Sequence, residues 1–172
     1  IAILSIALVF MLNPAETLKK ARDAQRISDL KTVKTALGIM LTASSTPRLD
    51  TAANPICTTD TSGNSQTQKI AYSVSPAPTF IGTKAAGSDT NSVSFTAIQQ
   101  HSSANATSTG KVDGYGWIPV NLKALTGGTP ISAFPVDPTN IVTSDPLATD
   151  LVYRYACQNG SPAAGKPSYV FE

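Results

Sequence analysis

Residues 1–41 read IAILSIALVFMLNPAETLKKARDAQRISDLKTVKTALGIML, an apolar stretch that runs directly into a charged, helix-forming one. Ile1 to Leu12 contains one polar residue, Ser5, and no charge. As a helix these residues would be about 18 Å long, whereas a bilayer core requires about 20 apolar residues. Because neither a Met nor a basic region precedes it, we expect Ile1 to lie inside a longer hydrophobic segment. The alternative is a core helix of a globular domain.

A second helical pattern follows Pro14. Proline removes a backbone hydrogen bond and disfavours helical geometry at Asn13, so we expect a kink or local unwinding at Asn13 and Pro14. From Ala15 to about Ser44 apolar residues recur at spacings of three and four, which predicts an amphipathic helix ending before Pro47. The stripe expected to dock on the rest of the protein comprises Leu18, Ala24, Ile27, Leu30, Val33, Leu37 and Met40, with Ala21 beside them. The opposite face is expected to carry Glu16, Lys19, Lys20, Arg22, Asp23, Arg26, Asp29, Lys31 and Lys34.

The chain beyond Pro47 has the pattern of short strands separated by turns. Its intervals are rich in Gly, Pro, Asn, Ser and Thr, which favour turns and loops. Residues 121–126, NLKALT, predict a short helical turn ahead of Gly127 and Gly128. Alternating and β-branched residues predict strands at 69–74, 92–98, 116–120, 151–156 and 168–172. The sequence therefore predicts an α+β fold: a long N-terminal helix, apolar in its first third and amphipathic after it, packed on a small antiparallel sheet with long loops.

Charge is sparse and unevenly distributed. The net charge is +2 and 14% of the residues are charged, but six of the 13 Lys and Arg lie between Lys19 and Lys34. A basic helix can bind nucleic acid, but three acidic residues and no aromatic ring accompany this one, which favours a solvated or intersubunit face. A surface made polar by Ser and Thr suits a secreted or surface protein better than a cytosolic enzyme.

The two cysteines, Cys57 and Cys157, lie too far apart for a CxxC redox or zinc motif. In an oxidising compartment we expect them to form a disulfide, which would stabilise the fold by about 4 to 5 kcal/mol in the chain-entropy model. The competing interpretation is two unrelated buried thiols.

Catalytic and metal-binding patterns are weak. The single His, His101, lies in the polar stretch QQHSSANATSTG, and the chain has no GxSxG, HExxH, phosphate-loop or GxGxxG motif. We therefore expect no enzyme and no cofactor. Asp137, Asp145 and Asp150 are weak calcium candidates, since Asp-Pro pairs more often initiate turns. The two NxS/T sequons, at Asn105 and Asn159, arise easily by chance in so Ser- and Thr-rich a chain.

The apolar helix, the proline and the run ARDAQRISDLKTVKTALGIML together resemble the N-terminal region of bacterial type IV pilins and pilin-like subunits. The resemblance covers residues 1–41 and, more weakly, PVDPTN followed by VYRYAC near the C-terminus. Aligning Pro14 with the family's proline places about eight residues ahead of Ile1, among them the methylated N-terminus and an acidic residue. Residues 51–123 resemble no family.

The resemblance implies three parts: residues 1–14 as a membrane and filament-core helix, residues 15–45 as an amphipathic helix, and residues 46–172 as a β-rich head. It implies a structural subunit, a major pilin, of a surface filament used for adhesion, twitching motility or DNA uptake. Alternatives are a pseudopilin of a type II secretion or competence system, or a membrane-anchored adhesin that never polymerises. Filament-core packing is expected from Ile1, Ile3, Leu4, Ile6, Leu8, Val9, Phe10 and Leu12.

The same resemblance implies the partners and the location. Identical subunits would form a homopolymer on the cell surface, anchored in the inner membrane before assembly. The pilus assembly machinery is the implied partner inside the cell envelope, and surface or DNA ligands are implied outside it. A disulfide between Cys57 and Cys157 would lock the C-terminal strands of a head that folds outside the reducing cytosol.

Overall fold

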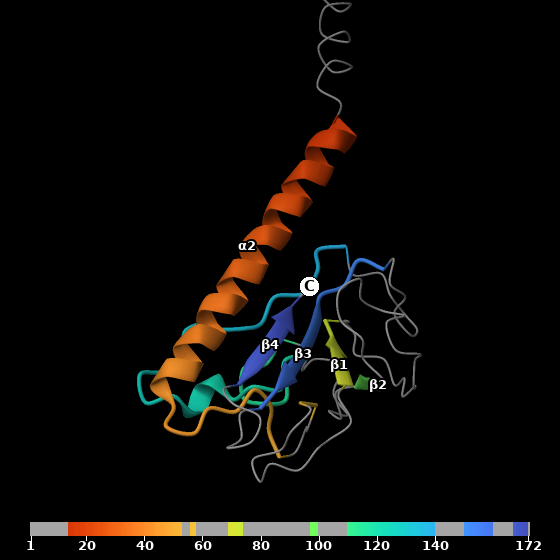
Figure 1. The fold of residues 1–172 in the computed structure, drawn as a ribbon. Coiled ribbons are helices and arrows are strands. Elements are labelled where there is room, and N and C mark those ends of the chain that lie inside the picture. The colour runs from red at the N-terminus through yellow and green to blue at the C-terminus, as the bar shows by residue number, and fades with distance from the viewer. Residues whose placement is uncertain are drawn as a thin grey trace, which may run out of the picture.

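A computed structural model gives an α+β fold, in which one long helix lies against a head built around a small sheet (Figure 1). The structure describes residues 14–52, 56–57, 69–73, 97–99, 110–139, 150–159 and 167–171. In chain order its elements are helix α2 (Pro14–Ala43), strands β1 (Lys69–Tyr72) and β2 (Ala97–Gln99), the 3-10 turn η1 (Leu122–Ala124), and strands β3 (Arg154–Gln158) and β4 (Ser168–Phe171).

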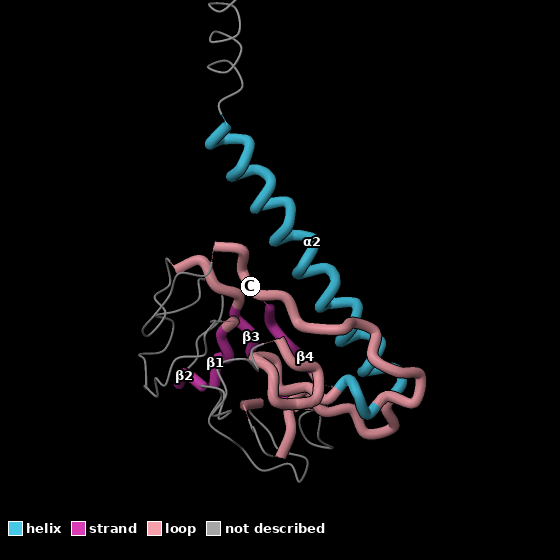
Figure 2. The backbone as a smooth tube through the Cα atoms, turned by 180° about the vertical axis from the view of Figure 1, so that it is seen from behind, coloured by secondary structure: helices cyan, strands magenta, loops and turns pink. Residues whose placement is uncertain are grey.

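Helix α2 has local reasons for both of its ends. Pro14 occupies the first helical position, where its missing N–H costs nothing, and Glu16 lies in the first turn, where a negative charge is favourable. The helix ends at Ala43 as expected, and the Ser44 N–H donates to the Met40 carbonyl oxygen at 3.1 Å. Figure 2 shows that the C-terminal half of α2 lies against the head while its N-terminal half extends beyond it.

The sheet has the strand order β2-β1-β3-β4. Strands β1, β3 and β4 are antiparallel, with Ala71 opposite Tyr155 and Cys157 opposite Tyr169. The expectation of a purely antiparallel sheet is wrong at one edge, because β2 runs parallel to β1 and pairs Ile70 with Ile98. A parallel neighbour requires a long crossover connection, and the long segment between the two strands meets that requirement.

The strand expected at residues 116–120 is absent, although the segment is buried. Trp117, Ile118 and Val120 are all fully buried, yet the segment forms irregular loop structure. Pro119 has no N–H to donate to a ladder, so the apolar run fills the core without pairing as a strand. Trp117 instead donates its ring N–H to the Pro135 carbonyl oxygen at 2.9 Å. The turn expected at residues 121–126 is confirmed by η1, which Asn121 caps by accepting from the Ala124 N–H.

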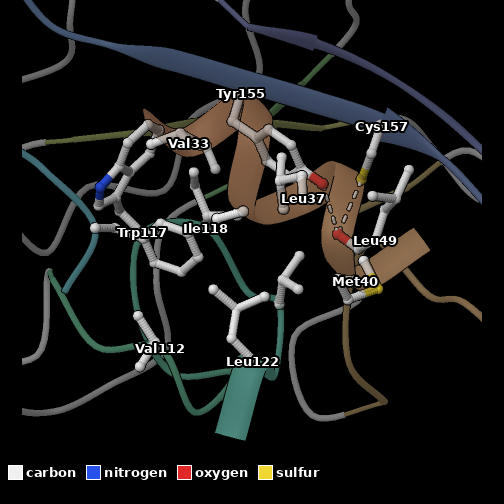
Figure 3. Packing of buried hydrophobic residues seen from close by; sticks show 14 of the residues in the cluster. Val33, Leu37, Met40, Leu49, Val112, Trp117, Ile118, Leu122, Tyr155 and Cys157 are labelled. Carbon is white, nitrogen blue, oxygen red and sulfur yellow. Dashed lines mark hydrogen bonds between the residues drawn. The ribbon is translucent and has the colours of Figure 1, made fainter. Parts of the chain in front are cut away.

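The core lies between α2, strand β3 and the 112–122 loop (Figure 3). Val33, Leu37 and Met40 of α2 contribute one side, and Tyr155 of β3 contributes another. The Tyr155 hydroxyl donates to the Leu49 carbonyl oxygen at 2.8 Å, which satisfies both groups inside the core. Cys157 Sγ lies 3.5 Å from the same oxygen, but a disulfide sulfur carries no proton, so this is a contact and not a hydrogen bond.

Candidate functional site

Helix α2 divides into a docked half and a protruding half (Figure 1). Val33, Leu37 and Met40 are buried against the head as predicted, and Leu30 is partly buried against the same cluster. Ala36 is also buried, although the sequence analysis did not select it. The available signal was its spacing, since Ala36 comes three residues after Val33 and four before Met40 and so shares their helix face.

The predicted docking stripe is wrong in its N-terminal part. Leu18 is 58% exposed and Ile27 is 55% exposed, and Ala24 is exposed as well. A step of three residues turns an α-helix by about 300°, so each such step falls about 60° short of a full turn. One and two such steps back from Leu30 therefore turn Ile27 and Ala24 away from the head. Leu18 comes back to within about 40° of the Met40 direction, and it is exposed because it lies in the N-terminal half of α2, which extends beyond the head (Figure 2). Leu18 and Ile27 are nine residues apart and therefore lie on opposite sides of α2. Nothing in the described residues covers either side chain.

Two charged residues expected on the solvent face, Arg26 and Asp29, face the head instead. The Arg26 guanidinium donates to Asp137 at 2.6 and 3.3 Å and to the Thr139 hydroxyl at 2.8 Å. The hydrogen bond to Asp137 is the main cause that raises the pKa of Arg26. The Tyr153 hydroxyl donates to Asp29 at 2.8 Å. By the same rotation of about 100° per residue, Arg26 lies near the Val33 and Leu37 side of the helix, not opposite it.

These contacts account for one of the three calcium candidates, Asp137. Asp137 is 4% exposed. Its carboxylate accepts hydrogen bonds from the Arg26 guanidinium and, at 2.7 Å, from the Thr139 N–H. Asp150 uses its backbone carbonyl to accept from the Val152 N–H. Asp145 lies outside the described residues. Within the described part of the chain no group of three His, Cys, Asp or Glu side chains could hold a metal ion.

The predicted disulfide between Cys57 and Cys157 is confirmed. The two Cα atoms are 4.6 Å apart and the residues are separated by 100 positions. Both cysteines are buried, with Cys57 at 0% and Cys157 at 1% exposure. Asp50 and Asn159, which sequence reasoning did not connect, are buried beside this bridge. Asn159 is also the acceptor residue of the second sequon, and a glycan would not fit on so buried a side chain.

A polar cleft of about 470 Å³ lies at the C-terminal end of α2. Its lining includes hydroxyl groups of Ser44, Ser45 and Thr46. Arg48 and Asp50 are the charged side chains of its lining, and they pair with each other at 3.3 Å. This cleft therefore does not bring together a nucleophile with a free acid or base.

The remaining predicted residues are placed only in part. Pro14 is the first residue of α2, while Asn13 and the filament-core set from Ile1 to Leu12 lie outside the described residues, as does His101. In the described part of the chain, no helix combines the length and the apolar character needed to cross a bilayer.

No protein family model matches this chain, and no characterised protein or solved structure is significantly similar to it.

Proposed function

We propose that this chain is the major structural subunit of a type IV pilus, a surface filament that serves adhesion, twitching motility or DNA uptake. The subunits associate through their N-terminal helices, which are anchored in the inner membrane before assembly. The resemblance of residues 1–41 to type IV pilins motivates this proposal, and the protruding half of α2 is the observation that carries it.

The argument rests on where α2 leaves apolar side chains exposed. Leu18 and Ile27, at 58% and 55% exposure, lie in the N-terminal half of the helix and not on the head. Burying apolar surface is favourable by about 25 cal/mol for each Å², so two large exposed side chains on one helix favour a partner. Neighbouring copies of the same helix, packed on both sides of it, would cover them without requiring a second kind of protein.

The docked half of α2 would keep the head attached when the filament is pulled. Arg26 contacts Asp137 and Asp29 contacts Tyr153, so polar contacts hold the helix where it leaves the head. Further along, the buried apolar residues hold the same helix against the sheet. The disulfide joins the segment after the helix to strand β3, so force on the head reaches a covalent link.

The experiment compares two exposed branched aliphatic residues of similar exposure that lie in different parts of the molecule. Ile27→Asp changes the protruding half of α2, whereas Leu151→Asp changes a head residue that is 51% exposed. Filaments sheared from expressing cells should fall by roughly tenfold or more for Ile27→Asp, because the new carboxylate would be buried between helices. Leu151→Asp should leave the yield unchanged. Equal yields for the two variants, with both heads folded and disulfide-bonded, would refute the proposal.

A further inference from the structure

A buried pair of polar side chains lies beside the disulfide. Asp50 is 3% exposed and Asn159 is 1% exposed, and the Asn159 Nδ2 donates to Asp50 Oδ1 at 2.6 Å. Asp50 follows helix α2 in the chain, whereas Asn159 comes two residues after Cys157. Burying a carboxylate is costly unless its oxygens are satisfied, so the contacts around Asp50 need to be accounted for.

The hydrogen bonds of this pair tie the two cysteine-bearing segments to each other or to themselves. Asp50 Oδ2 accepts from the backbone N–H groups of Ile56 and Cys57 at 3.1 and 3.0 Å. Asn159 Oδ1 accepts from the Leu49 N–H at 2.8 Å. Arg48 lies 3.3 Å from Asp50 Oδ1 and offsets its charge. The pair therefore fixes the backbone at Cys57 from one side and the backbone after Cys157 from the other.

We propose that Asp50 and Asn159 form a polar clasp that brings Cys57 and Cys157 together and thereby directs formation of their disulfide. The clasp consists of these two side chains and their hydrogen bonds to Leu49, Ile56 and Cys57. It can form before the disulfide exists, because none of its bonds involves a sulfur atom. This inference does not rest on the proposed function, since it concerns how the head matures and not what the head assembles into.

The chemistry that the clasp accelerates is thiol–disulfide exchange. One cysteine thiolate attacks a small disulfide oxidant, forms a mixed disulfide and releases one thiolate of that oxidant. The second cysteine thiolate then attacks the protein sulfur of the mixed disulfide and releases the second thiolate. Two electrons pass from the protein to the oxidant, and the two thiol protons pass to solvent. The clasp affects the second, intramolecular step, because it holds the two cysteines near each other.

The hydrogen-bonding pattern of the clasp suggests a sharp test. In Asp50→Asn the introduced amide N–H group would face the Asn159 amide N–H group, so two donors would meet. In Asn159→Asp two carboxylates would meet across the 2.6 Å contact. In the double variant Asp50→Asn/Asn159→Asp the donor and the acceptor exchange places. The contacts to Leu49, Ile56 and Cys57 can then form again, because the groups that accept from them are still oxygens.

The first measurement asks whether the clasp forms without the disulfide. In the full chain carrying Cys57→Ala and Cys157→Ala, amide hydrogen exchange at Ile56 and at position 57 should be slowed as in the oxidised protein. Exchange there as fast as in an unstructured peptide would overturn the proposal, whether the rest of the head is folded or not. In either case the clasp would depend on the disulfide instead of preceding it.

The second measurement follows the intramolecular step in the reduced full chain with oxidised glutathione, quenched by alkylation and read by mass. Each single variant should slow this step by roughly tenfold to a hundredfold, as expected for losing buried charge-assisted hydrogen bonds. The double variant should recover to within about threefold of the parent. Leu122→Ala serves as the control, because it removes a fully buried side chain outside the clasp and should leave the step nearly unchanged. The proposal would be overturned if Leu122→Ala slowed the intramolecular step as much as Asp50→Asn does. It would also be overturned if the double variant did not recover the rate of this step.

Discussion

The Arg26 guanidinium donates to both carboxylate oxygens of Asp137, a residue 111 positions away in the sequence. This contact lies where α2 leaves the head, and Asp137 is almost fully buried there. Arg26 also pairs with Asp23 on its own helix at 2.6 Å, but the Asp23 side chain is 66% exposed. One guanidinium thus makes one buried and one exposed ion pair, which allows the two to be compared directly.

We predict that the buried pair stabilises the fold and that the exposed pair does not. Asp137→Asn should lower the free energy of unfolding by about 2 kcal/mol, because a hydrogen-bonded charge pair is lost in a partly buried place. Asp23→Asn should change it by less than about 0.5 kcal/mol, since solvent screens an exposed pair. Urea unfolding followed by circular dichroism measures both. Equal losses in the two variants would contradict the structural assignment.

Stability should fall at alkaline pH because three tyrosines are harder to ionise in the folded protein. Burial raises the pKa of Tyr153, Tyr155 and Tyr169 above 10.0, and the hydrogen bond to Asp29 adds to the rise for Tyr153. Their contribution is fully present below pH 10 and is lost as the pH rises, because the unfolded chain then releases protons that the folded chain retains. The loss is at most about 1.4 kcal/mol per pH unit for each tyrosine. Unfolding free energies measured from pH 8 to pH 11 should show this decline, and Tyr155→Phe should make it shallower.

A methyl group at Gly116 should destabilise the head. A Cβ at this position would collide with the carbonyl oxygen of Lys111, which is backbone and cannot easily move aside. Gly116→Ala should therefore cost about 2 to 4 kcal/mol of unfolding free energy. Gly127→Ala is the control, because no atom lies within 4 Å of its Cβ and the change should be neutral or slightly stabilising. A neutral Gly116→Ala would mean that the 111–116 turn is wrongly described.

Reduction of the disulfide should require unfolding of the head. Cys57 and Cys157 are 0% and 1% exposed, so a soluble reductant cannot reach either sulfur in the folded protein. Reduction by a phosphine or dithiol should be slow in buffer and should accelerate steeply at the urea concentration that unfolds the head. Fast reduction in buffer, with the fold retained, would show that the bridge is accessible.

Local patterns predicted the elements whose signals are local. The helix end at Ala43, the strands β1, β3 and β4, and the turn at Leu122 follow from breakers, β-branched residues and caps close to them in sequence. The strand predicted at residues 116–120 was wrong because a buried loop and a buried strand have the same kind of apolar sequence. Pro119 was the signal against strand pairing, since it has no N–H to donate. The parallel pairing of β2 could not be predicted, because it depends on how a distant segment returns to the sheet.

The functional contacts were harder to predict because their partners are far apart in sequence. Counting apolar spacings of three and four placed Arg26 and Asp29 on the wrong face, since a run of threes drifts around the helix. Nothing near Arg26 in the sequence identifies Asp137, and nothing near Asp50 identifies Asn159. The disulfide was predictable because two cysteines allow one pairing and the resemblance implied an oxidising compartment.

The central claim is that copies of this chain assemble through the protruding half of α2, and imaging the assembled material tests it most directly. Electron microscopy of the full-length protein released from cells by shearing should show regular helical fibres. A reconstruction of these fibres should place Leu18 and Ile27, exposed in the single chain, against helices of neighbouring subunits. Material that contains only separate subunits, or fibres in which both side chains remain exposed to solvent, would contradict the account.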